Sequence, residues 1–464
     1  MIGLFGSLDL ASNSLATQQE AMAVAGQNMA NVNNPAYARE RAVVQTTSSI
    51  DTQAGQEGTG AGIVSISEVR DALLDNQIQS ETSVTSNYST QQSALQNAEA
   101  YLGEQVTNTS GSSASSSSGL AAMLSNLFNS FSSMTTGSGD PATVVQSAQE
   151  VTNQFNQVSA SLSQVQSNLN TSIQNDVASV NQDLGQIATL NKQIMVAQAG
   201  GGTADDLVDT REQTIENLSG LMNISTSAQA DGSMNVSFGT DQLVTGGSVA
   251  DNLQAYDAGG GNLLVKNTSG ATLDVTGGSI AGNITARDVA LAGLQTGLNT
   301  LASQLVTQVN GIYSQGCAPG GGSGQDFFSG DSAANIAVNS ALVADPSQFQ
   351  ASSTAGADGD TQIALDLANL GSQPIAALGG QTFSQSYAQT VTNLGNAINT
   401  ATDQLNTSQA ISTSLTNQRS SESGVSIDEE MTNMMQFQKA YEASAQLVST
   451  LNAMMETVIN MKIN

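Results

Sequence analysis

The chain has 464 residues, of which 11% are charged and 4% aromatic, and it contains no histidine. Ten lysines and arginines stand against 39 aspartates and glutamates, so the formal net charge is -29. This charge repels nucleic acid phosphates and anionic lipid surfaces and argues against both as partners. Without histidine, a Ser-His-Asp triad or a Cys-plus-His zinc site cannot form. We therefore expect no cofactor, and Cys317 is expected to be a buried or loop thiol.

The first segment carries an apolar seam with alternating steps of three and four residues. Its members are Leu4, Leu8, Ala11, Leu15, Gln18, Met22, Ala25, Met29 and Val32. This spacing predicts a coiled-coil-like helix that ends before Pro35. The opening residues lack the basic region and apolar run of a secretory signal, and no stretch approaches the ~18 apolar residues of a membrane span. We therefore expect any export to use no cleaved signal.

The middle of the chain predicts a long helical rod. Short strands are expected at residues 43–44 and 63–66, a helix at 69–102 and a Ser-rich flexible loop at 109–119. From residue 151 the seam resumes at Phe155, Val158, Leu162, Val165, Leu169, Ile173, Val177, Val180, Leu184, Ile187 and Ile194. This pattern predicts a rod of about 65 Å that ends at residues 200–202, followed by a helix at 207–221 that folds back.

Residues 223–286 differ in character, because glycines and asparagines separate short β-like runs at 234–238 and 263–265. We expect an inserted β domain here, then helices at 289–313 and 382–415. The last segment places Ile427, Met434, Tyr441, Val448 and Met455 seven residues apart, with Phe437, Ser444, Leu451 and Val458 between them. Both chain ends are therefore predicted to be amphipathic helices with apolar seams.

The predicted fold class is α+β: a long coiled-coil-like helical bundle formed by both chain ends and a central rod, with a small inserted β domain. We expect a terminal helical core domain at residues 1–40 and 425–464. A rod-like, mainly helical domain is expected at 41–222 and 287–424, and the β domain at 223–286.

Two motifs at opposite ends of the chain carry a family resemblance. Asn31, Asn33, Pro35 and Tyr37 belong to the N-terminal motif at residues 28–39. The C-terminal motif, at 423–430, contains Gly424, Asp428, Glu429 and Glu430. The pair resembles the signatures of the axial proteins of the bacterial flagellum, which include rod, hook and hook-associated proteins. Interior matches at residues 205–211 with 218–219, at 282–288, and at 309–316 with 326–328 narrow the resemblance to the hook-associated proteins of the hook–filament junction.

This resemblance implies a structural subunit that is exported by the flagellar type III pathway with a cytoplasmic chaperone. The subunit would assemble outside the cell as a ring of identical copies, between hook protein and the second junction protein, and filament assembly would require it. The candidate packing residues of the terminal helices are Leu4, Leu8, Leu15, Met22, Met29, Met434, Phe437, Tyr441, Val448, Leu451, Met455 and Val458.

Simpler interpretations stand beside these. Asp428, Glu429 and Glu430 fit the N-terminal dipole of a helix without any binding role. Residues 321–328 match one calcium-binding nonapeptide, but a single copy has no neighbour to share the ion, and 358–360 is expected to be a turn. The alternatives for function are another axial protein (hook protein, the second junction protein or a flagellin), a surface adhesin or carbohydrate-binding module in the β insert, and an enzyme.

Overall fold

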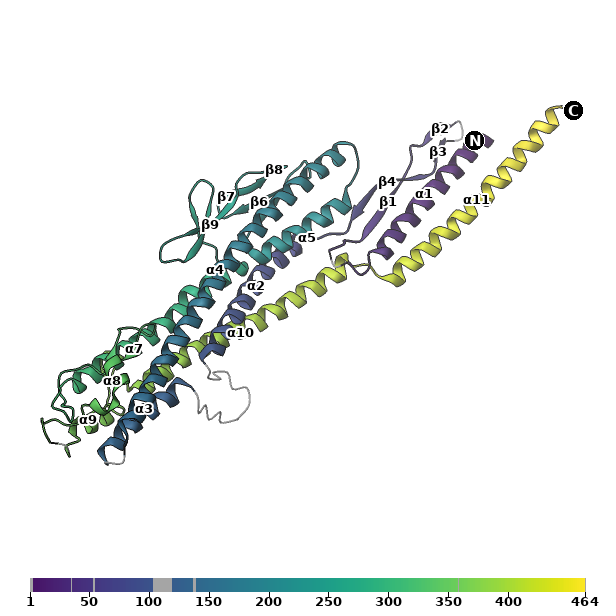
Figure 1. The fold of residues 1–464 in the computed structure, drawn as a ribbon. Coiled ribbons are helices and arrows are strands. Elements are labelled where there is room, and N and C mark those ends of the chain that lie inside the picture. The colour runs from purple at the N-terminus through teal and green to yellow at the C-terminus, as the bar shows by residue number, and fades with distance from the viewer. Residues whose placement is uncertain are drawn as a thin grey trace. The chain divides into compact units, whose positions relative to one another are not determined.

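A computed structural model of the chain (Figure 1) describes residues 3–34, 36–52, 55–102, 119–136, 139–357 and 359–463. Contacts divide the chain into two compact units. Unit 1 contains Met1–Ser83, Ala178–Leu253 and Ser408–Asn464, and unit 2 contains Val84–Val177 and Gln254–Thr407. Long helices and short strands confirm the predicted α+β class. Pro35, Asp358 and the predicted Ser-rich loop up to residue 118 lie outside the described residues.

In unit 1 the two chain ends form a helix pair beside a two-stranded ribbon (Figure 1). Helix α1 (Leu4–Ala30) packs along α11 (Ile427–Ile463). Its other side contacts β1 (Glu40–Thr46) and β4 (Ala61–Glu68), which pair antiparallel with a bulge at Val43/Val44. The short strands β2 (Ile50–Thr52) and β3 (Gly55–Glu57) also pair antiparallel.

The remainder of unit 1 contains helical segments and a four-stranded antiparallel meander. Helix α2 (Ala72–Leu102) starts in this unit, and the Asp71 carboxylate caps it by accepting a hydrogen bond of 2.9 Å from Leu73 N. Helix α5 (Asp205–Leu221) begins close to its predicted start. The strands are β5 (Ser225–Ala228), β6 (Met234–Phe238), β7 (Asp241–Thr245) and β8 (Ser248–Val249), in that order.

The predicted rod is helix α4 (Pro141–Ala199), and it is longer than expected. Its 59 residues span about 88 Å at 1.5 Å per residue, against the predicted 65 Å. The predicted start at residue 151 was wrong, because Asp140 caps the helix through Ala142 N at 2.9 Å and proline is preferred in a first turn. The seam was correct: every predicted apolar position from Phe155 to Ile194 is 7% exposed or less.

Unit 2 is built around one apolar core. Strands β9 (Leu253–Asp257), β10 (Leu263–Asn267) and β11 (Thr272–Leu273) form a sheet in the order β11-β10-β9. They precede α6 (Gly278–Thr285), a π-helical turn (Ala286–Leu291) and α7 (Ala292–Tyr313), so the helix expected at 289–313 starts earlier than predicted. Helix α10 (Phe383–Ser423) starts with a Thr382–Gln385 capping box and runs past its predicted end into unit 1.

The core of unit 2 is rich in aromatic rings. Helices α3 (Leu120–Thr135), α8 (Ser340–Ala344) and α9 (Gln362–Leu370) and the strands β12 (Phe328–Ser329) and β13 (Ala337–Val338) contribute to it. Phe327 lies against Tyr313 and Phe131 with ring centroids 5.1 and 5.6 Å apart, in edge-to-face geometry. Such contacts add to the stabilisation from apolar burial.

Candidate assembly site of the terminal helices

The predicted seams of α1 and α11 face each other, but they do not form a closed core. Ala11 and Ala25 are buried in α1, whereas Leu4, Leu8, Leu15, Met22 and Met29 are half-buried. In α11, Leu451 is buried, Met434, Phe437, Tyr441, Val448 and Met455 are half-buried, and Val458 is 60% exposed. The Ser14 and Ser444 hydroxyls, 3.0 Å apart, mark the register of the pair.

A second set of apolar side chains on this pair is exposed to solvent. It comprises Phe5 of α1 and Ile427, Met431, Met435, Leu447, Met454, Ile459 and Met461 of α11, each at least 45% exposed. Single exposed apolar residues are ordinary on protein surfaces, but a series of them along one helix marks an interaction surface. The terminal helix pair can therefore bury further apolar area against another protein surface.

The N-terminal signature forms a buried hydrogen-bonded turn after α1. The Asn28 side chain donates to Glu40 O at 2.8 Å, and its Oδ1 accepts from Glu40 N and from the Tyr37 hydroxyl, each at 2.9 Å. Tyr37 is 8% exposed, so its ring is packed into the protein. Of the other signature residues, Asn31 is half-buried and Asn33 is exposed.

The C-terminal signature meets this turn at Arg39. Arg39 N donates to Ser423 O at 2.9 Å, and Arg39 Nη1 donates to Glu429 Oε2 at 2.9 Å. Arg39 Nε lies 2.9 Å from Glu430 Oε1, in a geometry that makes an ion pair but no hydrogen bond. Glu429 and Glu430 therefore lie in the first turn of α11, as expected, and they also pair with Arg39. Asp428 is exposed and Gly424 is half-buried.

A cluster of carboxylates around Arg70 adjoins the signature turn. The Arg70 guanidinium pairs with Glu68 at 3.1 Å, with Asp75 at 3.3 Å and with Asp209. Burial raises the pKa of Glu68 to about 8, although Arg70 opposes the shift. Burial likewise raises the pKa of Asp209 to about 6, and burial together with Asp205 and Asp206 raises the pKa of Glu40 to about 7. One guanidinium does not offset this many buried acids.

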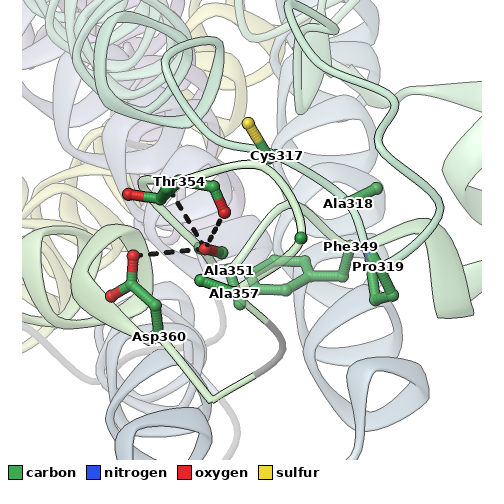
Figure 2. Close-up of a pocket in the computed structure, with 10 residues that line it drawn as sticks. Cys317, Ala318, Pro319, Phe349, Ala351, Thr354, Ala357 and Asp360 are labelled. Carbon is green, nitrogen blue, oxygen red and sulfur yellow. Dashed lines mark hydrogen bonds between the residues drawn. The ribbon is translucent and has the colours of Figure 1, made fainter.

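The hollow next to Cys317 in unit 2 is a different kind of feature. Phe349, Ala351 and Pro319 line a cavity of about 40 Å³. Figure 2 shows Asp360 and Thr354 on one side of it, and the Asp360 carboxylate accepts from the Ser352 hydroxyl at 3.1 Å. Hydrogen bonds from Ser353, Gln362 and Ser352 lower the pKa of Asp360 to about 2. These bonds satisfy the Asp360 carboxylate within its own loop, so the residues around the cavity form a structured turn. Cys317 is a half-buried thiol in a loop.

In the part of the chain that the structure describes, no group of three or more cysteines, aspartates and glutamates could hold a metal ion. None of the described helices is both long and apolar enough to cross a bilayer.

Comparisons with known proteins point to the flagellum. Residues 104–328 match the family described as "Flagellar hook-associated protein FlgK helical domain". Residues 416–461 match "Flagellar basal body rod FlgEFG protein C-terminal". The structure is similar to the flagellar hook junction protein FlgK from Burkholderia pseudomallei, with a TM-score of 0.59, 16% identity, and coverage of 75% of this chain and 99% of that chain. That likeness supports the fold.

Relatives that match over nearly the whole chain indicate which flagellar protein family this is. The chain is 27% identical to flagellar hook-associated protein 1 of Bacillus subtilis, over 99% of both chains. It is 24% identical to the protein of the same name from Salmonella typhimurium, over 97% of this chain and 99% of the other. The chain therefore belongs to the axial proteins of the bacterial flagellum. Within that class, it is a member of the hook-associated protein 1 family.

Sequence reasoning missed two parts of the site. The motifs pointed to Tyr37, Glu429 and Glu430, but not to Arg39 as the residue that contacts both carboxylates. The Arg70 cluster was also missed, although Asp205 and Asp209 lie inside an interior match. The available signal was that Arg39 and Arg70 are rare positive charges in segments that otherwise carry few charges, which indicates that each pairs with a carboxylate.

Proposed function

We propose that this chain is a structural subunit of the bacterial flagellum that forms the junction between hook and filament. The observation that carries the proposal is the terminal helix pair, whose apolar side chains are exposed along α11 and at Phe5. Burying such side chains contributes about 1.5 to 3 kcal/mol each, which copies of the same chain can gain by packing side by side. The full-length similarity to flagellar hook-associated protein 1 supports this position in the flagellum.

We further propose the finer features of this role. The subunit leaves the cell through the flagellar type III pathway with a cytoplasmic chaperone, and it forms a ring outside the cell that contacts hook protein and the second junction protein. It has no catalytic role. The proposed domains are residues 1–40 and 425–464, 41–222 and 287–424, and 223–286. The pairing of α1 with α11 supports the first of these domains. Strands β5 to β11 lie within the proposed 223–286 domain, with β5 to β8 in unit 1 and β10 and β11 in unit 2.

Deletion of the gene tests the proposed function. We expect mutant cells to carry hooks without filaments and to release flagellin into the medium, because the filament has no lattice on which to start. Electron microscopy of the cells and immunoblots of the medium measure both effects, and the wild-type gene supplied in trans is the control. Normal filaments on the deletion strain would contradict the proposal.

A further inference from the structure

The bend between α10 and α11 converges on one arginine. Helix α10 ends at Ser423 and α11 starts at Ile427, with Gly424 between them. A Cβ at Gly424 would lie 2.2 Å from Ser420 O, so the chain turns too tightly here for a side chain. The Arg39 backbone joins this bend to the ribbon, because its N–H donates to Ser423 O at 2.9 Å and its carbonyl accepts from Val69 N at 2.8 Å.

The Arg39 side chain then reaches the start of α11. Glu429 is 61% exposed, so its pairing with Arg39 contributes little. Glu430 differs, because its side chain is 3% exposed and Arg39 Nε lies 2.9 Å from its carboxylate. A buried carboxylate that loses its partner is strongly destabilising, since its charge is then neither hydrated nor paired. Without Arg39, the first turn of α11 would have to move until Glu430 reaches water.

We propose that Arg39 is the positioning residue of the C-terminal helix: by neutralising buried Glu430 while its backbone holds Ser423, it fixes the direction in which α11 leaves the bend. The inference rests on the proposed function in one respect, namely that assembly requires this direction. Arg39 stabilises the arrangement of α11 that the structure shows. Its role is therefore distinct from the apolar packing along the seam.

A set of variants separates the neutralisation of the Glu430 charge by Arg39 from a simple packing role of the Arg39 side chain. Arg39→Gln leaves Glu430 buried and unpaired, whereas the double variant Arg39→Gln, Glu430→Gln removes both charges at similar volume. Glu429→Gln tests the exposed partner. Arg41→Gln is the matched control, since Arg41 is an exposed arginine of β1, two residues after Arg39.

The first readout is hydrogen exchange of the purified chain at the amides of residues 39, 69 and 430. We expect exchange at residue 430 to be at least about tenfold faster in Arg39→Gln, since unpairing a buried charge shifts the local equilibrium by more than that. The double variant should return to within about threefold of wild type, and Glu429→Gln and Arg41→Gln should not change it. Unchanged exchange in Arg39→Gln, or equally fast exchange in the double variant, would overturn the proposal.

The second readout is the fraction of hooks that carry filaments when each variant is supplied to the deletion strain, with the amount of chain in the medium as a control for export. We expect Arg39→Gln to lower the fraction and the double variant to restore it. Full filament assembly with Arg39→Gln would overturn the link to assembly. Failure of the wild-type gene to restore filaments would instead contradict the proposed function, and the exchange measurement would still decide the role of Arg39.

Discussion

Asparagine side chains of α4 and two buried arginines of neighbouring helical segments bind strand and turn backbone in each unit. In unit 1, the Asn191 side chain donates to Met234 O at 2.8 Å and to Gly246 O at 2.7 Å, and Arg211 Nη1 donates to Gly232 O at 2.7 Å. In unit 2, the Asn170 side chain donates to Gly261 O at 2.7 Å, and Arg287 Nη1 donates to Leu263 O at 2.7 Å. The same pairing of asparagine and arginine thus satisfies strand and turn backbone in both units.

Close backbone approach explains one glycine of α6. A Cβ at Gly282 would lie 2.5 Å from Asn87 O of α2 and 2.8 Å from Thr90 Cβ. We expect Gly282→Ala to lower the free energy of unfolding by about 1 to 3 kcal/mol, because one of the two helices must shift. Urea unfolding followed by circular dichroism measures the change.

The matched control is Gly293 of α7, where a Cβ meets nothing within 4 Å. Gly293→Ala should stabilise the chain by roughly 0.5 to 1 kcal/mol, since alanine restricts the unfolded chain and favours the helix. Equal effects of the two substitutions would show that the approach of α6 to α2 is not tight.

Elements with a repeating seam were predictable from sequence, and elements defined by distant partners were not. The α4 seam follows from local spacing, whereas the start of α4 is set by the Asp140 cap, which lies ahead of the first seam residue. Helix α1 was predicted with one apolar face, yet Thr17 donates to Ala61 O at 3.0 Å and buries a second face against β4. The contact of Arg39 with Glu430 joins residues far apart in sequence, so no local pattern contains it.

The carboxylate cluster around Arg70, where β1, β4, α2 and α5 meet, makes the free energy of unfolding depend on pH. Glu68, Glu40 and Asp209 hold their protons to pH values of about 8, 7 and 6 in the folded chain. In the unfolded chain these carboxyl groups lose their protons at about pH 4. Between these limits the folded state binds more protons, so the free energy of unfolding falls as pH rises and the benefit is lost above about pH 8.

The variant Glu68→Gln isolates one of these protons. We expect the decline in unfolding free energy between pH 5 and pH 8 to become shallower by up to about 1.4 kcal/mol per pH unit, which is the value for one proton. Urea titrations at several pH values measure the slope. Glu442→Gln, which alters an exposed carboxylate, is the control and should leave the slope unchanged. An identical slope in wild type and Glu68→Gln would contradict the assigned role.

At the scale of the whole molecule, only 11% of residues are charged but the net charge is -29, so copies of the chain repel one another and their association must draw on apolar contacts. Exposed large apolar side chains are most numerous on the terminal helices, while the segment with strands β5 to β8 carries polar residues such as Ser248 on its surface. We therefore expect the terminal helices to be covered in the assembled flagellum and the β insert to face solvent.

Cysteine labelling tests this expectation most directly. In a Cys317→Ser background, Val458→Cys places a thiol on the exposed side of α11, and Ser248→Cys places one on the β insert. Both should react with a maleimide in the isolated chain. In purified hook–filament complexes, Ser248→Cys should still react, whereas labelling of Val458→Cys should fall at least about tenfold because neighbouring subunits cover α11. Equal labelling of Val458→Cys in the isolated chain and in the complex would contradict assembly through the terminal helices.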